Sequence, residues 1–212
     1  MNVPTKIGLI SDVHATAGPV QEALAVFQRQ RVDRVFCVGD IAGYGTELDQ
    51  TVGLLIGSGC ETIMGNHDLW YLDNHPDGKA GLVVAFFEKL PLWLQVTLEG
   101  KRVYLVHASP PQSLMKGITL LDQNAQILAE RKTRWTGELE GSEFDVLVVG
   151  HTHQVFAEQL GNVLVINPGS TKFNHSCAIL SLPEMELQFF PLSNKKLMRV
   201  WNWGMADDEA GS

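Results

Sequence analysis

Carboxylate, amide and imidazole side chains recur in this sequence directly after short apolar runs, where a buried strand would end. Seven residues share this position: Asp12, His14, Asp40, Asn66, His107, His151 and His153. Oxygen and nitrogen donors of this kind, without cysteine, are typical ligands of Mn²⁺, Fe, Co²⁺ or Zn²⁺. Burying so many of them together would be costly without cations, because each would lose its hydration. The set therefore predicts a metal site rather than a packed core.

Each motif by itself also has a plainer interpretation. The segments Asp12-Val13-His14 and Gly39-Asp40 could be turn chemistry after a strand, and His107 alone could be a half-buried histidine. The segment Gly150-His151-Thr152-His153 is more specific, because alternate residues of an extended segment point the same way and can face one metal cluster. The interpretation as a metal site therefore depends on the combination.

The elements that must position these residues follow from hydrophobic spacing. In the first 65 residues, apolar runs at 6–11, 34–38 and 61–64 alternate with helical patterns at 19–30 and 46–58, the second with Thr46 as the expected N-cap. Alternation of strand and helix predicts βαβ units and a parallel sheet. Asp12, Asp40 and Asn66 would then meet at the carboxyl edge of that sheet, where open α/β sheets bind ligands. We expect all seven ligands to gather on this one sheet edge.

Beyond residue 70 the pattern changes and the elements become shorter. We expect a loop at 74–78, a hairpin at 95–107, helices at 80–90 and 120–132, a strand at 145–149, and four last strands at 155–160, 163–167, 177–182 and 186–191. These four are most simply a second, antiparallel-rich sheet. The fold class is therefore α/β, a two-sheet α/β sandwich of mixed sheets flanked by helices. Residues 1–212 are interpreted as one domain, with a small cap segment around 70–92 and a loose tail at 204–212.

Composition narrows the classes of partner and compartment. The chain has 16 basic and 24 acidic residues and a formal net charge of −8, which disfavours nucleic acid or an anionic membrane as a partner. Bound cations can reverse the potential locally, so a small phosphorylated substrate stays open. The sequence has no apolar run long enough to span a membrane and no recognisable secretory signal. Cys37, Cys60 and Cys177 form no metal or disulfide pattern, which suits a reducing cytoplasm.

Taken together, the polar motifs resemble those of a known family, the calcineurin-like metallophosphoesterases. Its five motifs are similar to the segments 12–14, 39–45 and 65–68, to His107, and to the segment 150–153. The form Gly-Asp-x-x-Gly-Tyr-Gly at 39–45, and Asn-Pro-Gly-Ser at 167–170, resemble the small bacterial and archaeal phosphodiesterase-like subgroup. The resemblance covers roughly residues 6–192 and implies the metallophosphoesterase fold.

The resemblance implies two divalent metal ions per chain. One would be held by Asp12, His14, Asp40 and His153, and the other by Asp40, Asn66, His107 and His151, with Asp40 as the bridge. Mn²⁺ is the first expectation, with Fe, Zn²⁺, Co²⁺ or Ni²⁺ as alternatives. Such a pair binds phosphoryl oxygens and lowers the pKa of a bridging water, whose hydroxide attacks phosphorus in line.

His67 is the catalytic residue that the resemblance carries over, since it stands beside Asn66 without being a ligand. It would donate a hydrogen bond or a proton to the leaving oxygen. A third metal-ligand role and a surface histidine are the alternatives.

The match departs from the protein phosphatase branch of this superfamily. There, an Asp three residues after the bridging Asp partners the catalytic His, and an Arg precedes the Gly-Asn motif; here Gly43 and Met64 stand at those positions. Without an arginine to grip a dianionic monoester, we favour phosphodiester hydrolysis.

There are three alternatives: phosphomonoesterase activity on the same site, a non-enzymatic scaffold of the same fold such as the related retromer subunit, and a nuclease. Every matched position keeps a chemically competent residue, which favours the enzyme. Cyclic nucleotides, phospholipid head-group diesters and dinucleotides all stay open as substrates, and so does a homo-oligomer.

Other polar and aromatic residues admit two roles each. Asp68, Asn167 and Ser170 could support the site or serve turn and helix-start chemistry, and Lys172 and His175 could touch substrate from a nearby loop. The residues that could line a cap, although core packing is favoured for most, are His75, Trp70, Tyr71, Phe86, Phe87 and Trp93. Trp201 and Trp203 are expected to pack, or to mark an oligomer contact.

Overall fold

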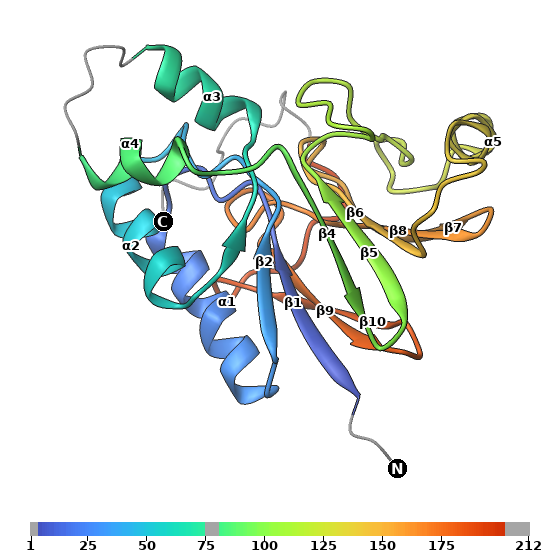
Figure 1. Cartoon of the computed structure of the whole chain (residues 1–212), viewed down its shortest axis with the longest axis horizontal. Coiled ribbons are helices and arrows are strands. Elements are labelled where there is room, and N and C mark those ends of the chain that lie inside the picture. The colour runs from blue at the N-terminus through green and yellow to red at the C-terminus, as the bar shows by residue number, and fades with distance from the viewer. Residues whose placement is uncertain (1–3, 75–80, 202–212) are drawn as a thin grey trace.

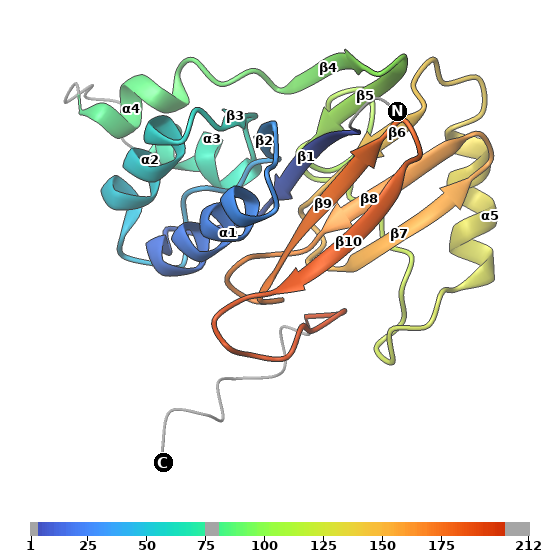
Figure 2. The same ribbon diagram turned by 90° about the horizontal axis from the view of Figure 1, so that it is seen from below.

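Two five-stranded sheets form the frame of the protein in the computed structural model (Figure 1). The structure describes residues 4–74 and 81–201. In chain order the elements are β1 (Thr5–Ile10), α1 (Ala17–Arg29), β2 (Arg34–Cys37), α2 (Leu48–Gly57), β3 (Glu61–Thr62), α3 (Asn66–Asp73), α4 (Leu82–Phe87), β4 (Trp93–Leu98), β5 (Lys101–Val106), α5 (Ala129–Glu138), β6 (Val146–Val148), β7 (Val155–Leu160), β8 (Val163–Pro168), β9 (Ser176–Leu182) and β10 (Glu186–Pro191). Helices α1, α2 and α4 lie on one side and α5 on the other (Figure 2). The predicted two-sheet α/β sandwich is confirmed.

The first sheet has the strand order β10-β9-β1-β2-β3. Strands β1, β2 and β3 are parallel, as the alternation of strands and helices predicts. Strand β9 pairs antiparallel with β1, and β10 pairs antiparallel with β9. The prediction that all four last strands belong to a second sheet is therefore wrong for β9 and β10. Hydrophobic spacing identifies a strand but not its partner, and here β9 covers the unpaired backbone groups along one edge of β1.

The second sheet has the order β4-β5-β6-β8-β7. Its central strands β5, β6 and β8 are parallel, and β4 and β7 pair antiparallel at the two edges. One apolar layer includes buried residues of both sheets, among them Ile7, Leu9, Phe36, Val103, Leu105, Val148 and Leu180. Each such side chain stabilises the fold by about 1.5–3 kcal/mol when fully buried. This layer fixes the two sheets, and hence the ends of their strands, relative to each other.

Helix α2 begins later than the sequence pattern indicates. Its first residue is Leu48 and its N-cap is Glu47, so Thr46 is not the cap. The Glu47 carboxylate accepts a hydrogen bond from the backbone N–H of Ala17, the first residue of α1 (3.0 Å). The start of α2 is therefore set by a contact between two helices, which local sequence does not reveal.

Helix α5 begins at Ala129 rather than near residue 120. Leu120 and Leu121 are buried in an extended segment, and their backbone N–H groups donate to Oε1 of Gln154. The Asp122 carboxylate accepts two backbone hydrogen bonds in a turn that separates this segment from the helix. Among the helices of the described ranges, none is long and apolar enough to cross a membrane.

Candidate metal centre

The seven candidate ligands lie just beyond the carboxyl ends of strands from both sheets, six in loops and Asn66 as the first residue of α3. From the first sheet come Asp12 and His14 after β1, Asp40 after β2 and Asn66 after β3; from the second come His107 after β5, and His151 and His153 after β6. The sequence predicts that one sheet edge gathers them all, and this is wrong. Two edges contribute, and the apolar layer between the sheets brings them together.

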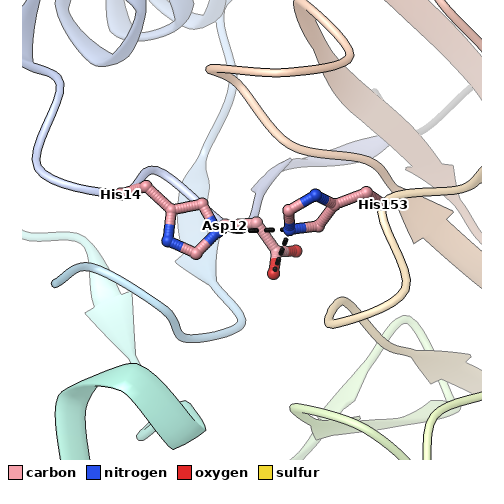
Figure 3. Close-up of side chains that lie close together, drawn as sticks. All are labelled: Asp12, His14 and His153. Carbon is pink, nitrogen blue, oxygen red and sulfur yellow. Dashed lines mark hydrogen bonds and ion pairs between the residues drawn. The ribbon is translucent and has the colours of Figure 1, made fainter. Parts of the chain in front are cut away.

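One group of ligand atoms combines both sheets. Asp12 and His14 come from the loop after β1, and His153 reaches them from the loop after β6, with the three side chains pointing toward one another (Figure 3). The Nε2 atoms of His14 and His153 lie 3.1 Å apart, and His153 Nε2 lies 3.3 Å from Oδ1 of Asp12. All three residues are buried. Their ligand atoms all lie within 4.8 Å of one another, so one cation could contact them all.

Asp40 belongs to the two other ligand groups. One contains His14, Asp40 and His67, and the other contains Asp40, His107 and His151. His107 Nε2 lies 3.4 Å from Oδ1 of Asp40, and His67 Nε2 lies 4.0 Å from its Oδ2. The Asp40 carboxylate therefore lies between the group that includes His14 and the group that includes His107.

Asn66 adds an amide to the second half of the centre. Its side-chain amide lies 3.1 Å from His107 Nε2 and 2.9 Å from His151 Nδ1. The backbone N–H of His151 also donates to both carboxylate oxygens of Asp12 (3.1 Å each), which links the loops of the two sheets. The structure thus brings together all seven residues that the sequence singles out.

Two histidines have their tautomer set by the main chain. The Nδ1 of His107 lies 2.7 Å from the carbonyl oxygen of Val38, and that of His14 lies 3.1 Å from the carbonyl of Ala42. Because a carbonyl only accepts, each Nδ1 donates, and Nε2 faces the centre, where its lone pair is available to a metal ion once the ring is neutral. Imidazole, carboxylate and amide groups that converge in this way fit a divalent cation.

The charges at the centre favour ionised carboxylates. Burial alone would raise the pKa of Asp12, but the charge and hydrogen bond of His153 hold it below its usual value. For Asp40, burial is likewise outweighed by His107, and its pKa is lowered. Burial lowers the pKa of His14 to about 4. For His107, burial is outweighed by the charge and hydrogen bond of Asp40 together with the charge of Asp12, and the pKa rises to about 9. Two buried anions therefore face the centre, where cations would compensate them.

The backbone of the centre is strained. Five of the seven candidate ligands have a positive φ that side chains other than glycine rarely adopt: Asp12 (50°), His14 (45°), Asp40 (56°), His151 (65°) and His153 (48°). Such conformations cost on the order of 1–3 kcal/mol each and cluster at functional sites. The fold tolerates this strain, and the strained conformations direct the five side chains into the centre.

Asp68 supports the centre from behind the ligands. It is buried, and its Oδ1 accepts hydrogen bonds from the backbone N–H groups of Ile41 and Ala42 (2.8 Å each), while Oδ2 accepts from that of Gly65 (2.8 Å). The interpretation as an exposed helix-start carboxylate is therefore wrong. Burial, and then the charge of Asp40, raise the pKa of Asp68 to about 7. The residue ties the loop that carries Asp40 to the start of α3.

Polar residues near the end of the chain hold the other loops. Asn167 Nδ2 donates to the carbonyl of Gly150 (3.0 Å), and the Ser170 hydroxyl donates to the carbonyl of Asp12 (2.5 Å). Both residues thus contact the loops of the centre rather than serving turn chemistry alone.

Sequence reasoning missed two further residues of this kind, Ser11 and Asn174. The Ser11 hydroxyl donates to Oδ2 of Asp12 (2.5 Å), and Asn174 Nδ2 donates to the carbonyl of His153 (2.9 Å). The only signal for Ser11 is its place beside a ligand at the end of an apolar run. Asn174 lies in a polar loop without periodicity, which offers no signal.

His67 lies next to Asp40 and directly over Gly43. Its backbone N–H donates to Oδ1 of Asp40 (2.9 Å), and burial lowers the pKa of its ring. A Cβ atom at position 43 would lie 2.6 Å from His67 Nδ1, and Gly43 has a φ of +93°. In this arrangement position 43 has no room for a carboxylate that could partner the histidine.

The remaining candidates fall into two sets. Several of them lie outside the described residues: His75, Trp203, the tail at 204–212 and the part of the predicted loop and cap at 75–80. Among the described residues, Phe87 is buried, but Trp70 and Trp93 are exposed rather than packed in the core. The backbone carbonyl of His175 accepts a hydrogen bond from the N–H of Leu192. Burial, and then the charge of Lys195, lower the pKa of the His175 ring.

Known proteins of one family are similar to this chain. Residues 5–184 match the model of the calcineurin-like phosphoesterase superfamily domain. The phosphodiesterase YfcE of Escherichia coli K12 is 26% identical over 168 residues, which covers 78% of either chain. The phosphodiesterase MJ0936 of Methanocaldococcus jannaschii is 22% identical over 170 residues, covering 77% of this chain and 82% of its own.

Solved structures support the same fold. A metallophosphoesterase from Sphaerobacter thermophilus superimposes with a TM-score of 0.64 at 20% identity, over 90% of this chain and 89% of its own. The family match extends over most of the chain and over all the candidate ligands, from Asp12 to His153. The chain therefore belongs to the calcineurin-like phosphoesterase superfamily.

Proposed function

We propose that this protein is a phosphodiesterase that works with two divalent cations bound at the centre described above. The matching family model describes a calcineurin-like phosphoesterase domain, and the two sequence relatives named above are phosphodiesterases. The observation that carries the dinuclear arrangement is the position of the Asp40 carboxylate, whose ligand atoms lie within 4.8 Å of that of His14 on one side and of those of His107 and His151 on the other. A carboxylate has two oxygens and can contact one cation with each.

The ligands divide into two sets that share Asp40. The first is Asp12, His14, Asp40 and His153, and the second is Asp40, Asn66, His107 and His151. When bound, the cations would neutralise phosphoryl oxygens and supply hydroxide at neutral pH. Carboxylate, amide and imidazole donors without thiolate suit Mn²⁺, Fe, Co²⁺ or Zn²⁺ alike, and Mn²⁺ is the first choice by the resemblance to the family.

Hydrogen bonds within the chain hold the ligands in position for this chemistry. The carbonyls of Val38 and Ala42 hold His107 and His14 in one tautomer, so that neither ring can turn its N–H toward the centre. Asp68, Asn167 and Ser170 hold the loops by hydrogen bonds to the backbone. The geometry is thus set before a substrate arrives, which lowers the cost of reorganisation during the reaction.

His67 is the residue that we assign to the leaving group. It is half-buried beside Asp40, to which its backbone N–H donates, while its ring Nε2 lies 4.0 Å from Oδ2, beyond hydrogen-bond distance, and can face a substrate. From there it can donate a hydrogen bond or a proton to the departing alkoxide oxygen.

A diester fits the centre better than a monoester. A monoester carries an extra negative charge, which arginine forks commonly bind. Position 64, where an arginine would stand in the phosphatase branch, is the buried apolar Met64. A diester, with a single charge, can be held by the cations alone.

The substrate and the compartment follow from charge and cysteine content. A chain with a net charge of −8 suits a small phosphorylated substrate better than a nucleic acid. All three cysteines are free, two of them buried, which suits a reducing cytoplasm.

Turnover on a matched pair of esters tests the proposal. Protein stripped of metal with a chelator and reloaded with Mn²⁺ is assayed on bis(p-nitrophenyl) phosphate and on p-nitrophenyl phosphate. We expect a higher kcat/KM for the diester. A preference for the monoester would replace the diesterase by a phosphatase, and no turnover on either ester would favour the scaffold.

The role of Asp40 is tested with Asp40→Asn, which keeps the shape and removes the charge. We expect metal content below two ions per chain and a loss of roughly 100-fold or more in kcat/KM, because even residues behind the ligands change metal affinity or activity by 10–100-fold. The matched control is Asp145→Asn, which removes a surface carboxylate paired with Arg102. Full metal content in Asp40→Asn would contradict the bridge.

A further inference from the structure

Four aromatic rings form a continuous cluster beside the centre, and we name it the aromatic rim: Tyr44, His67, Trp70 and Phe173. The His67 ring lies 4.9 Å from both Tyr44 and Trp70, and Tyr44 lies 5.6 Å from Phe173 between ring centroids. The rim also contacts two candidate ligands, because Tyr44 lies 4.8 Å from His14, and Phe173 stacks on His153 at 5.2 Å. Whatever binds at the centre is therefore adjacent to the rim.

Two members of the rim expose large apolar surfaces to water. Tyr44 is 55% exposed and Trp70 is 44% exposed. Side chains of this size are usually well buried, since covering apolar surface is favourable. A single exposed aromatic residue needs no explanation, but two beside one polar centre form a surface that a ligand can cover.

The backbone holds Tyr44 outward at a cost. Tyr44 has a φ of +55°, a conformation that side chains other than glycine rarely adopt. Its neighbour Gly45 packs so tightly that a Cβ atom there would lie 2.2 Å from the carbonyl oxygen of Ala15. The loop is thus pressed against the loop after β1, and Tyr44 projects over the centre instead of joining the core. Strain of this kind points to a role in function.

The position of His67 in the rim indicates which part of a substrate would meet these rings. In the proposed function, His67 serves the leaving oxygen of the phosphodiester. The alcohol attached to that oxygen would then extend along His67, Tyr44 and Trp70. A planar aromatic group can stack on such rings, whereas a small aliphatic alcohol would leave them exposed.

We propose that the aromatic rim binds a planar aromatic group of the substrate, such as a nucleobase, so that the substrates are phosphodiesters of nucleosides or of similar aromatic alcohols. The inference rests on the proposed function only for the place of the phosphate. Stacking of a base on an aromatic side chain is worth roughly tenfold or more in affinity. The acidic chain favours a small ester over a polynucleotide.

Two product-like probes isolate the contribution of the base. Adenosine 5′-monophosphate and ribose 5-phosphate share phosphate and sugar, and only the first has a planar ring. Their binding to the Mn²⁺-loaded protein is measured by calorimetry, which does not require turnover. We expect the adenosine compound to bind about tenfold more tightly or better. Equal affinities would overturn the proposal.

Variants of the rim locate the effect. Trp70→Leu keeps an apolar helix former but removes the ring, and Tyr44→Asn keeps a residue that tolerates positive φ. Each should lower the affinity ratio of the two probes toward one and leave ribose 5-phosphate binding unchanged, while Trp70→Phe should keep most of the ratio. The matched control is Trp93→Leu on β4, a tryptophan of similar exposure (43%) with no rim contact recorded in the described ranges. A ratio that survives both rim variants would place the base elsewhere and overturn the proposal.

Two more comparisons separate the outcomes. The affinities of phenyl phosphate and methyl phosphate distinguish a general aryl site from a nucleobase site. If phenyl phosphate binds more tightly than methyl phosphate by the same factor as the adenosine compound over ribose 5-phosphate, the rim is a general aryl site. If only the adenosine compound gains affinity, the rim is a nucleobase site. If no diester is hydrolysed but the affinity ratio depends on the rim, the proposed function fails and the aromatic site stands. If diesters are hydrolysed and the ratio is one, only the aromatic site fails.

Discussion

At the scale of single residues, the ring of His67 is held differently from those of His14 and His107. His14 and His107 have their Nδ1 atoms bound to backbone carbonyls, whereas the His67 ring lies over Gly43 and among the rings of the rim. A ligand gains from a locked ring, but a proton donor must reach the substrate. In the proposed function this freer ring serves catalysis, and because it also lies within 4.8 Å of the ligand atoms of His14 and Asp40, metal analysis must separate that role from coordination.

Replacement of His67 separates catalysis from metal binding. We expect His67→Ala to retain two metal ions and to lose about 10²–10⁴-fold in kcat, the usual contribution of a general acid. His67→Gln should recover only part, because its amide can donate a hydrogen bond but gives up no proton. The loss should be smaller with p-nitrophenolate than with an alkoxide as leaving group. Kinetics and metal analysis of the same samples check this.

The control for His67 is His175→Asn, since burial lowers the pKa of that ring too, and Asn tolerates its positive φ. We expect wild-type turnover from this control. Loss of a metal ion in His67→Ala would show that His67 is a ligand, and near-normal turnover would remove it from the mechanism.

At the scale of elements, the loop after β2 and the start of α3 behave as one unit. Three backbone N–H groups from the two segments converge on the buried carboxylate of Asp68. The two segments carry Asp40, Asn66 and His67, so their relative position is set by one side chain. A helix start that is anchored in this way can be held without a strong apolar stripe, and α3 has none.

Asp68→Asn tests this link. The new amide can still accept from Ile41 and Ala42, but its NH₂ group would face the N–H of Gly65, leaving buried donors unpaired. We expect a loss of about 1–3 kcal/mol in the free energy of unfolding, measured with urea. The control is Asp33→Asn, where an exposed carboxylate accepts from the backbone N–H of Lys6, and where the change should stay within about 0.5 kcal/mol. Equal effects of the two substitutions would contradict the anchoring role.

At the scale of the whole molecule, the centre joins the two sheets. Asp12 and His153 belong to different sheets yet lie in one ligand group. A cation bound there would cross-link the sheets in addition to the apolar layer between them. Metal binding should therefore stabilise the entire fold and not only its loops.

Removal of metal tests this coupling. A ligand at 100 times its Kd stabilises the native state by about 2.7 kcal/mol, and in a chain of this length each kcal/mol shifts Tm by roughly 2–4 °C. We expect a chelator to lower Tm by about 5–10 °C, and Mn²⁺ to restore it, in calorimetric scans. Asp40→Asn lacks the bridging carboxylate, so its Tm should fall by less when the metal is removed. An unchanged Tm after complete metal removal would show that the sheets are not coupled through the centre.

Much of the fold could be predicted because periodicity is a local property. The apolar runs of β1 and β2 and the helical spacing of α1 identify those elements by themselves. The partner of β9 could not be predicted, since an apolar run that is buried on both faces would fit either sheet. The start of α5 could not be predicted either, because the side chain of Gln154, far along the chain, holds Leu120 and Leu121 in extended form.

The sequence by itself determined the donor types, their places after apolar runs, and the resemblance of their order to one family, because these depend only on residue identity and spacing. Only the tertiary structure decided that two sheet edges supply the ligands, that Asp68 is a buried anchor, and that Tyr44 and Trp70 stand exposed beside the centre. Those features depend on how the apolar layer packs the sheets together. Packing between distant segments leaves no periodic trace in the sequence.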